Sequence, residues 1–142
     1  MSGRILVTGS REWTNVARLS VALVFAIRYV GHESRWPEVT IVHGDAGGAD
    51  ALVDRLAKEW LHCHVEPHPY IPVKHHGDPR ARNSEMVIAG ADFCIAAYIP
   101  PKGRRGGTRD CYEKAIAAGI PTLVVPHFAQ VPYGMVQEIQ GC

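Results

Sequence analysis

Short apolar segments alternate with longer amphipathic ones along this chain. Four of the apolar segments, at residues 4–9, 39–44, 93–99 and 121–126, end at or just before a Gly or a Pro. Because they are apolar throughout, instead of alternating with polar residues, they predict buried strands of a parallel sheet. A weaker strand is predicted at 63–70, where prolines indicate a position near the sheet edge.

Between these strands, apolar residues recur at intervals of three and four, which predicts helices. The helices cover residues 14–31, 49–61, 78–90 and 108–119. In the second of them, Asp50 falls outside the apolar stripe, so we expect it on the solvent-facing side.

The ends of two helices carry capping signals. Thr14 or Asn15 can cap the first helix, because their side-chain oxygens can accept hydrogen bonds from its unpaired N–H groups. Asp78 is placed to cap the third helix, with Pro79 at its first position and Gly90 as its stop.

Strands that alternate with helices five times predict an α/β fold. Right-handed crossovers make it a single doubly wound, mainly parallel five-stranded sheet with helices on both faces, a Rossmann-like architecture. The 142 residues form one domain, 1–142, in which the pattern leaves 127–142 unassigned. If the chain winds outward from the first strand and then returns beside it, a ligand crevice lies between the first and fourth strands.

The first helix carries a second apolar face, at Val21, Val24 and Phe25. This face belongs either to the core or to a contact between two copies of the chain.

The composition excludes several classes of protein. An apolar fraction of 46% with 20% charged residues is typical of a soluble globular domain. A net charge of +1 argues against a general nucleic-acid or membrane binder. No apolar stretch reaches the roughly 18 residues of a membrane span, and no signal peptide precedes the first strand. With four scattered cysteines and no such signal, we expect a cytoplasmic protein with reduced thiols.

Three turns that follow predicted strands are candidates for contact with a ligand. In TGSR (8–11), Ser10 and Arg11 can reach a phosphate or a ribose, although the glycine here also suits an ordinary turn. In HGDAGGAD (43–50) and RRGGTRD (104–110), small residues lead into a helix whose unpaired N–H groups attract anions. The alternatives are tight packing of helix on strand for the first of these two and a solvated basic loop for the second. The candidate ligand residues are Thr8, Gly9, Ser10, Arg11, Gly44, Gly47, Gly48, Asp50, Arg82, Asn83, Gly106, Gly107 and Thr108.

Basic residues gather near the same predicted edge of the sheet. Arg82, in the first turn of its helix, could pair bidentately with a phosphate, although such an arginine is often only solvated. A near-neutral protein with this local charge suits a small polyphosphate ligand better than a long nucleic acid. The residues are Lys74, His75, His76, Arg80, Arg82, Lys102, Arg104, Arg105 and Arg109.

Eight histidines raise the question of a metal, but no HExxH or CxxC spacing occurs, so we predict no metal site and no cofactor. There is also no P-loop, no GxGxxG and no GxSxG. The carboxylates Asp45, Asp50 and Asp110 lie near the predicted crevice, and nothing in the pattern makes them an acid–base pair.

Five segments, RILVTGSREW, IVHGDAGGADALVDRLA, PRARNSEM, GADFCIAAY and GGT…A…GIPTLVV, together resemble the YspA/YpsA-related branch of the SLOG superfamily. The similarity runs in order over residues 4 to 126. This Rossmann-like group also contains the LOG phosphoribohydrolases and the DprA nucleic-acid proteins. The resemblance implies a five-stranded Rossmann-like domain, a ligand built from a nucleotide, and a homodimer.

The LOG enzymes cleave the base–ribose bond of a nucleoside monophosphate, with an Arg in an RKxxM motif and a Glu three residues after the Thr of PGGxGTxxE. Arg82 matches the first motif, with Asn83 in place of its Lys. The second motif is not matched, because Cys111 stands three residues after Thr108. Asp110, one position earlier, or Glu113, two positions later, could replace the Glu. The resemblance therefore implies Arg82 and Asp110 as catalytic candidates.

Three functions follow as hypotheses. The first is binding, sensing or sequestering of a small nucleotide-derived ligand, either ADP-ribose-like or a nucleoside phosphate. The second is an N-glycoside-cleaving enzyme of the phosphoribohydrolase or deoxyribosyltransferase type. The third is single-stranded nucleic-acid binding, against which stand the near-zero charge and the lack of an aromatic stacking series.

Overall fold

The structure, a computed structural model, describes residues 2–31, 38–101, 106–127 and 139–140. Its strands are β1 (Ser2–Gly9), β2 (Glu38–His43), β3 (His64–Pro67), β4 (Phe93–Tyr98), β5 (Thr122–Pro126) and β6 (Ile139–Gln140). Its helices are α1 (Val16–Gly31), α2 (Ala49–Leu56), the π-helical turn η1 (Ala57–Leu61), α3 (Pro79–Ala89) and α4 (Gly107–Ala117). Each predicted strand and helix is present, and the second predicted helix ends as a π turn.

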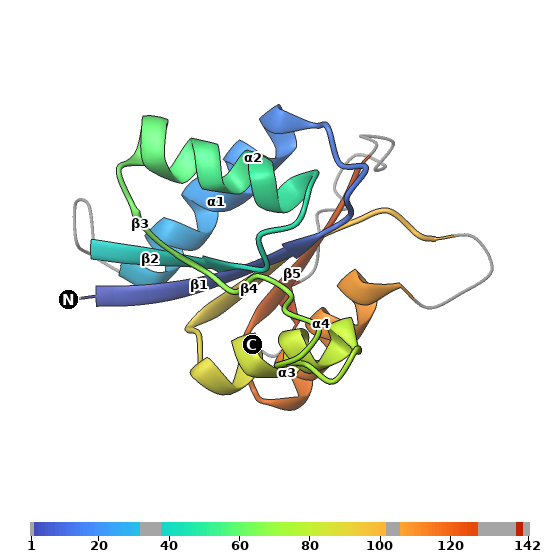
Figure 1. The fold of residues 1–142 in the computed structure, drawn as a ribbon. Helices are drawn as coiled ribbons and strands as arrows, with labels where there is room; N and C mark the ends of the chain where they lie inside the picture. Colours follow the sequence, from blue (N-terminus) through green and yellow to red (C-terminus); the bar gives the residue numbers. More distant parts are fainter. Residues whose placement is uncertain (1, 32–37, 102–105, 128–138, 141–142) are drawn as a thin grey trace.

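The strands form one sheet in the order β3-β2-β1-β4-β5-β6. The first five strands are parallel, and β6 is antiparallel to β5. In Figure 1, α1 and α2 cover one face of this sheet, and α3 and α4 cover the other. The predicted doubly wound, Rossmann-like sheet is therefore confirmed, and its winding reverses between β1 and β4. The short β6 lies in the stretch that the sequence pattern left unassigned.

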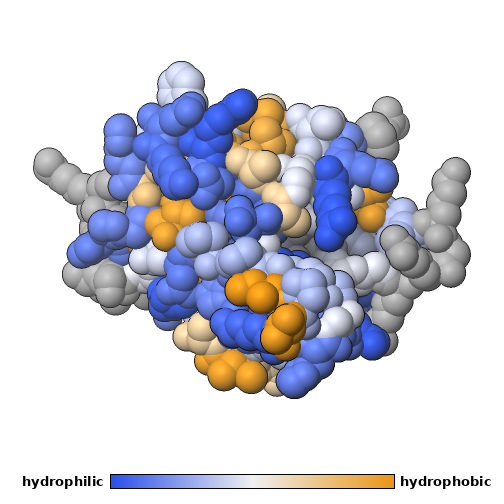
Figure 2. Space-filling model, in the orientation of Figure 1, coloured by the Kyte–Doolittle hydropathy of each residue, from blue (hydrophilic) through white to orange (hydrophobic). Residues whose placement is uncertain are grey.

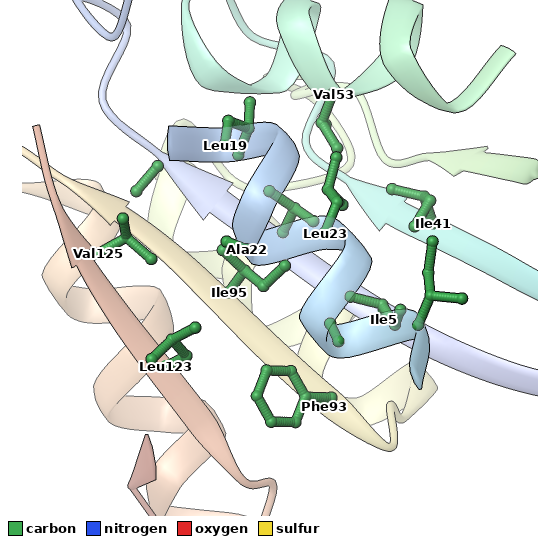
Figure 3. Packing of buried hydrophobic residues seen from close by; sticks show 14 of the residues in the cluster. Ile5, Leu19, Ala22, Leu23, Ile41, Val53, Phe93, Ile95, Leu123 and Val125 are labelled. Atoms are coloured by element: carbon green, nitrogen blue, oxygen red, sulfur yellow. The ribbon is translucent and has the colours of Figure 1, made fainter. Parts of the chain in front are cut away.

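Side chains of β1 alternate between two hydrophobic clusters. Ile5 and Val7 belong to the larger cluster, which Figure 3 shows between α1, α2 and the sheet. Leu6 faces the other way and packs in the smaller cluster with Met86 of α3 and Cys111 of α4. Because both faces of the strand are buried, its apolar residues follow one another without polar alternation.

The capping predictions are confirmed where the structure tests them. The Asn15 side chain accepts a hydrogen bond from the Arg18 N–H at 3.0 Å, so Asn15 is the residue that caps α1. The Asp78 side chain accepts from the Arg80 N–H at 2.9 Å, at the start of α3. These bonds satisfy N–H groups that a helix start otherwise leaves unpaired.

The second apolar face of α1 is exposed. Val21, Val24 and Phe25 are 71%, 37% and 42% exposed, respectively. The alternative that places this face in the core of the chain is therefore wrong, and the contact between two copies stays a prediction. Among the described residues, no helix combines the length and the apolar character that crossing a membrane would require.

Candidate functional site

The turn after β1 is joined to the strand and the helix beside it. The Ser10 N–H donates to the Ala97 carbonyl at 2.9 Å, and the Ser10 carbonyl accepts from the Ala49 N–H at 3.1 Å. A side chain at Gly9 would place its Cβ closer than 3.0 Å to both Ala49 and Ala97. Gly9 thus permits close packing, and this turn lies at the point where the sheet winding reverses.

Two neighbouring glycines of the turn between β2 and α2 have different surroundings. Gly48 has a φ of +65°, and a Cβ there would lie closer than 3.0 Å to the carbonyl oxygens of Ser10 and Arg11. A Cβ at Gly47 would have no atom within 4 Å. The packing explanation therefore holds for Gly48, whereas Gly47 leaves the surface of the turn open.

Asp50, in the first turn of α2, is buried, with 4% exposure, so its predicted solvent-facing position is wrong. Its Oδ2 accepts hydrogen bonds from the N–H groups of Gly44 at 3.1 Å and Ala46 at 3.3 Å. A carboxylate at a helix start can fold back onto the preceding loop, which a helical stripe does not show. Burial raises the pKa of the Asp50 carboxyl, although nearby charges and these two N–H donors oppose the rise.

Two adjacent residues of α3 join the two glycine-rich turns. Arg82 donates from Nη1 to the Gly44 carbonyl. Asn83 is buried and donates from Nδ2 to the Gly107 carbonyl at 3.1 Å and to Asp110 Oδ2 at 3.1 Å. The two turns therefore lie close together at the carboxyl end of the sheet.

Among the residues that the structure describes, no side chain caps the start of α4. Its N-cap residue is Gly106, and the candidate ligand residue Thr108 lies in the first turn of the helix. A Cβ at Gly107 would have no atom within 4 Å. An uncapped start of this kind exposes N–H groups and the positive end of the helix dipole.

Asp110 and Cys111 are neighbours in α4, but their surroundings differ. Asp110 pairs with Lys114 at 2.9 Å, besides its bond to Asn83. Cys111 is fully buried, and burial is the largest cause that raises the pKa of its thiol to about 12, against a hydrogen bond with Thr8. The position that matches the LOG glutamate therefore holds a buried neutral thiol.

Three of the basic residues that the sequence places at this edge of the sheet are paired with acids. Lys74 pairs with Glu85 at 2.8 Å, Arg80 with Asp78 at 3.1 Å and Arg109 with Glu113 at 3.2 Å. Arg80 and Asp78 are two residues apart and Arg109 and Glu113 four, so only the Lys74–Glu85 pair joins separate segments of the chain. Lys102, Arg104 and Arg105 lie outside the described residues.

The remaining predicted residues have these positions. Arg11 is exposed, and the Ser10 Oγ accepts a hydrogen bond from the Glu12 N–H at 3.1 Å. His76 is exposed, whereas His75 is buried.

A network of ion pairs links β1, β3 and α3, and the sequence reasoning missed it. Arg4 donates to both oxygens of Glu66, at 2.9 and 2.8 Å. His68 lies 2.7 Å from Glu66 Oε2 and 2.5 Å from Glu85 Oε2. The side-chain hydrogen bond with Arg4 is the largest cause that lowers the pKa of Glu66 to about 2, and the bond with Lys74 does most to lower that of Glu85 to about 2. Arg4 and Glu66 are 62 residues apart and His68 and Glu85 are 17 apart, so no local motif could reveal the network.

An open depression of about 370 Å³ lies between α3 and α4. Its lining comprises Asp78, Arg80, Ala81, Ser84, Asp110 and Lys114. Its charged side chains pair with one another, which leaves the turns at the carboxyl ends of β1, β2 and β4 as the better candidate for a ligand. Figure 2 shows a mostly hydrophilic surface on the pictured face, with apolar side chains in small separate groups.

The part of the chain that the structure describes holds no group of three or more His, Cys, Asp or Glu arranged for a metal ion.

The fold and these contacts define a Rossmann-like α/β protein with a polar centre where its sheet winding reverses. The chain is 40% identical over 126 residues to the Gene 61 protein of Mycobacterium phage D29. The matched region covers 84% of this chain and 94% of that protein. The chain therefore belongs to the same family as the Gene 61 protein. No protein-family model matches the sequence. No solved structure matches it.

Proposed function

We propose that this protein binds a small nucleotide-derived ligand, ADP-ribose-like or a nucleoside phosphate, at the carboxyl end of its sheet beside β1 and β4. The observation that supports this most is the link between the two glycine-rich turns: Arg82 bonds to Gly44, and Asn83 bonds to Gly107. In doubly wound sheets, ligands bind where the strand order reverses, and this link lies at that place.

The phosphate of the ligand would lie at the start of α4. Within the described ranges, this start has no side-chain cap, and a Cβ at Gly107 would meet no atom within 4 Å. The turn before α2 is less suited to a phosphate, because the N–H groups of Gly44 and Ala46 already donate to the Asp50 carboxylate. A second anion there would meet a buried negative charge.

The resemblance to the SLOG superfamily supports the same class of ligand. N-glycoside cleavage has less support, because the position of the LOG glutamate holds the buried Cys111. Asp110, the candidate replacement, is held by Asn83 and Lys114. The cytoplasmic location and the homodimer stay predictions.

Isothermal titration and thermal shift with AMP, ADP-ribose and inorganic phosphate test the proposal. A ligand at 100 times its dissociation constant stabilises a protein by about 2.7 kcal/mol, which a thermal shift detects. The informative variant is Gly107→Asp. Its new side chain has room, and a carboxylate at a helix start stabilises by about 0.3–1 kcal/mol.

Gly107→Asp should therefore fold at least as stably as the wild type and bind the phosphate compounds more weakly. Two like charges about 5 Å apart repel by about 3 kcal/mol at an effective dielectric constant near 20, so we expect at least about a tenfold rise in Kd. Gly47→Asp is the matched control, because its turn is equally open and already carries the Asp50 carboxylate. If only Gly47→Asp weakened binding, the phosphate would lie at α2. If neither variant changed it, our placement of the site would be wrong.

A further inference from the structure

Asp50 has one carboxylate oxygen that the protein does not use. Its Oδ2 accepts from two backbone N–H groups, whereas Oδ1 is buried and has no hydrogen-bond partner among the described residues. Buried carboxylate oxygens are nearly always hydrogen-bonded, because an unsatisfied charged acceptor destabilises the fold. This exception therefore needs an explanation.

Arg82 and Asp50 both contact the backbone of Gly44: Arg82 donates to its carbonyl, and Asp50 accepts from its N–H. The hydrogen bonds of Arg82 all go to uncharged oxygens: the carbonyls of Gly44 and His68, the latter at 3.3 Å, and Asn83 Oδ1 at 3.2 Å. These bonds use Nε and Nη1. Among the described residues, no hydrogen bond of Arg82 uses Nη2, so a half-buried cation keeps a donor next to an acid that keeps an acceptor.

The chemistry of this pair selects the group that it can bind. A phosphate would be repelled by Asp50, and an ammonium group would be repelled by Arg82. An apolar group would leave both charges unsatisfied. A hydroxyl both donates and accepts, so two adjacent hydroxyls can donate to Asp50 Oδ1 and accept from Arg82.

We propose that Asp50 and Arg82 form a subsite for the vicinal hydroxyls of a ribose whose phosphate lies at the start of α4. This inference rests on the proposed function and adds the sugar to it. Asn83 connects the two subsites, because it contacts Arg82 on one side and Gly107 on the other.

The test compares AMP with 2′,3′-dideoxy-AMP by isothermal titration on the full chain. The two probes carry the same base and phosphate and differ in the hydroxyls. A hydrogen bond to a charged group is strong enough that we expect the dideoxy compound to bind wild-type protein about tenfold or more weakly. In Asp50→Asn the preference for AMP over 2′,3′-dideoxy-AMP should disappear, because the affinity for AMP should fall to that for the dideoxy compound.

Asp45→Asn is the control variant, because it removes the same charge from an exposed residue of the same turn. It should keep the preference for AMP. Equal affinities of the two probes for wild-type protein would overturn the ribose subsite and leave the phosphate site standing. Loss of the difference in Asp45→Asn would also overturn it, since a general charge effect would then explain the result. If wild-type protein bound no AMP, both the subsite and the proposed function would fail. The wild-type comparison decides the question even if Asp50→Asn does not fold.

Discussion

Gly48→Ala provides a direct test of why the turn before α2 is rich in glycine. At this position φ is +65°, and the added Cβ would lie closer than 3.0 Å to the carbonyl oxygens of Ser10 and Arg11. A left-handed conformation costs a residue other than glycine about 1–2 kcal/mol. The Cβ meets backbone atoms, which cannot rotate away, so the turns must separate.

That separation would also break the bond from the Ala49 N–H to the Ser10 carbonyl, now 3.1 Å long, at a cost of about 1 kcal/mol. Together these effects destabilise the protein by about 3 kcal/mol. For a domain of this size, the expected fall in Tm is about 10 °C.

Gly47→Ala is the matched control, one residue earlier in the same turn. Nothing lies within 4 Å of its Cβ position, and its φ lies outside the left-handed range. We expect Gly47→Ala to raise the free energy of unfolding by between 0 and about 1 kcal/mol, because alanine restricts the conformations of the unfolded chain. Urea unfolding and calorimetry of both variants measure the contrast. Equal stability of Gly48→Ala and Gly47→Ala would refute the packing explanation, and the turn would then owe its glycines to something other than the fold.

The other predictions concern pH and self-association. Glu66 has its pKa lowered in the folded state, so it stabilises the protein above its ordinary pKa of 4.5, and this contribution disappears as pH falls toward about 2. Glu66→Gln should therefore lose less stability than wild type between pH 5 and pH 3, as measured by urea unfolding. Glu38→Gln, at an exposed position, is the control. Parallel curves of stability against pH for wild type and Glu66→Gln would contradict this prediction. If two copies associate through α1, Val21→Lys should halve the mass measured by light scattering. The free energy of unfolding of this variant should stay within about 0.5 kcal/mol of the wild-type value. An unchanged dimer would place the contact elsewhere, and a monomeric wild type would contradict the homodimer itself.

The local pattern of the sequence was enough to predict the elements and the class of fold. Apolar runs such as 4–9 and 93–99 need burial on both faces, and only a parallel sheet between two helical layers provides it. Asp78 with Pro79 marked the start of α3, because capping depends on residues within one turn. The antiparallel β6 was not predicted, since its two residues carry too little pattern.

The sequence by itself determined which segments are strands and helices and which turns are rich in glycine, because these properties depend on neighbours along the chain. Tertiary structure decided the roles of those turns: Gly48 packs against Ser10 and Arg11, whereas Gly107 lies open. It also buried Asp50, which a helical stripe places in solvent, and paired Arg4 with Glu66. These outcomes depend on distances between segments that are tens of residues apart, and such distances are set only when the helices pack on the sheet.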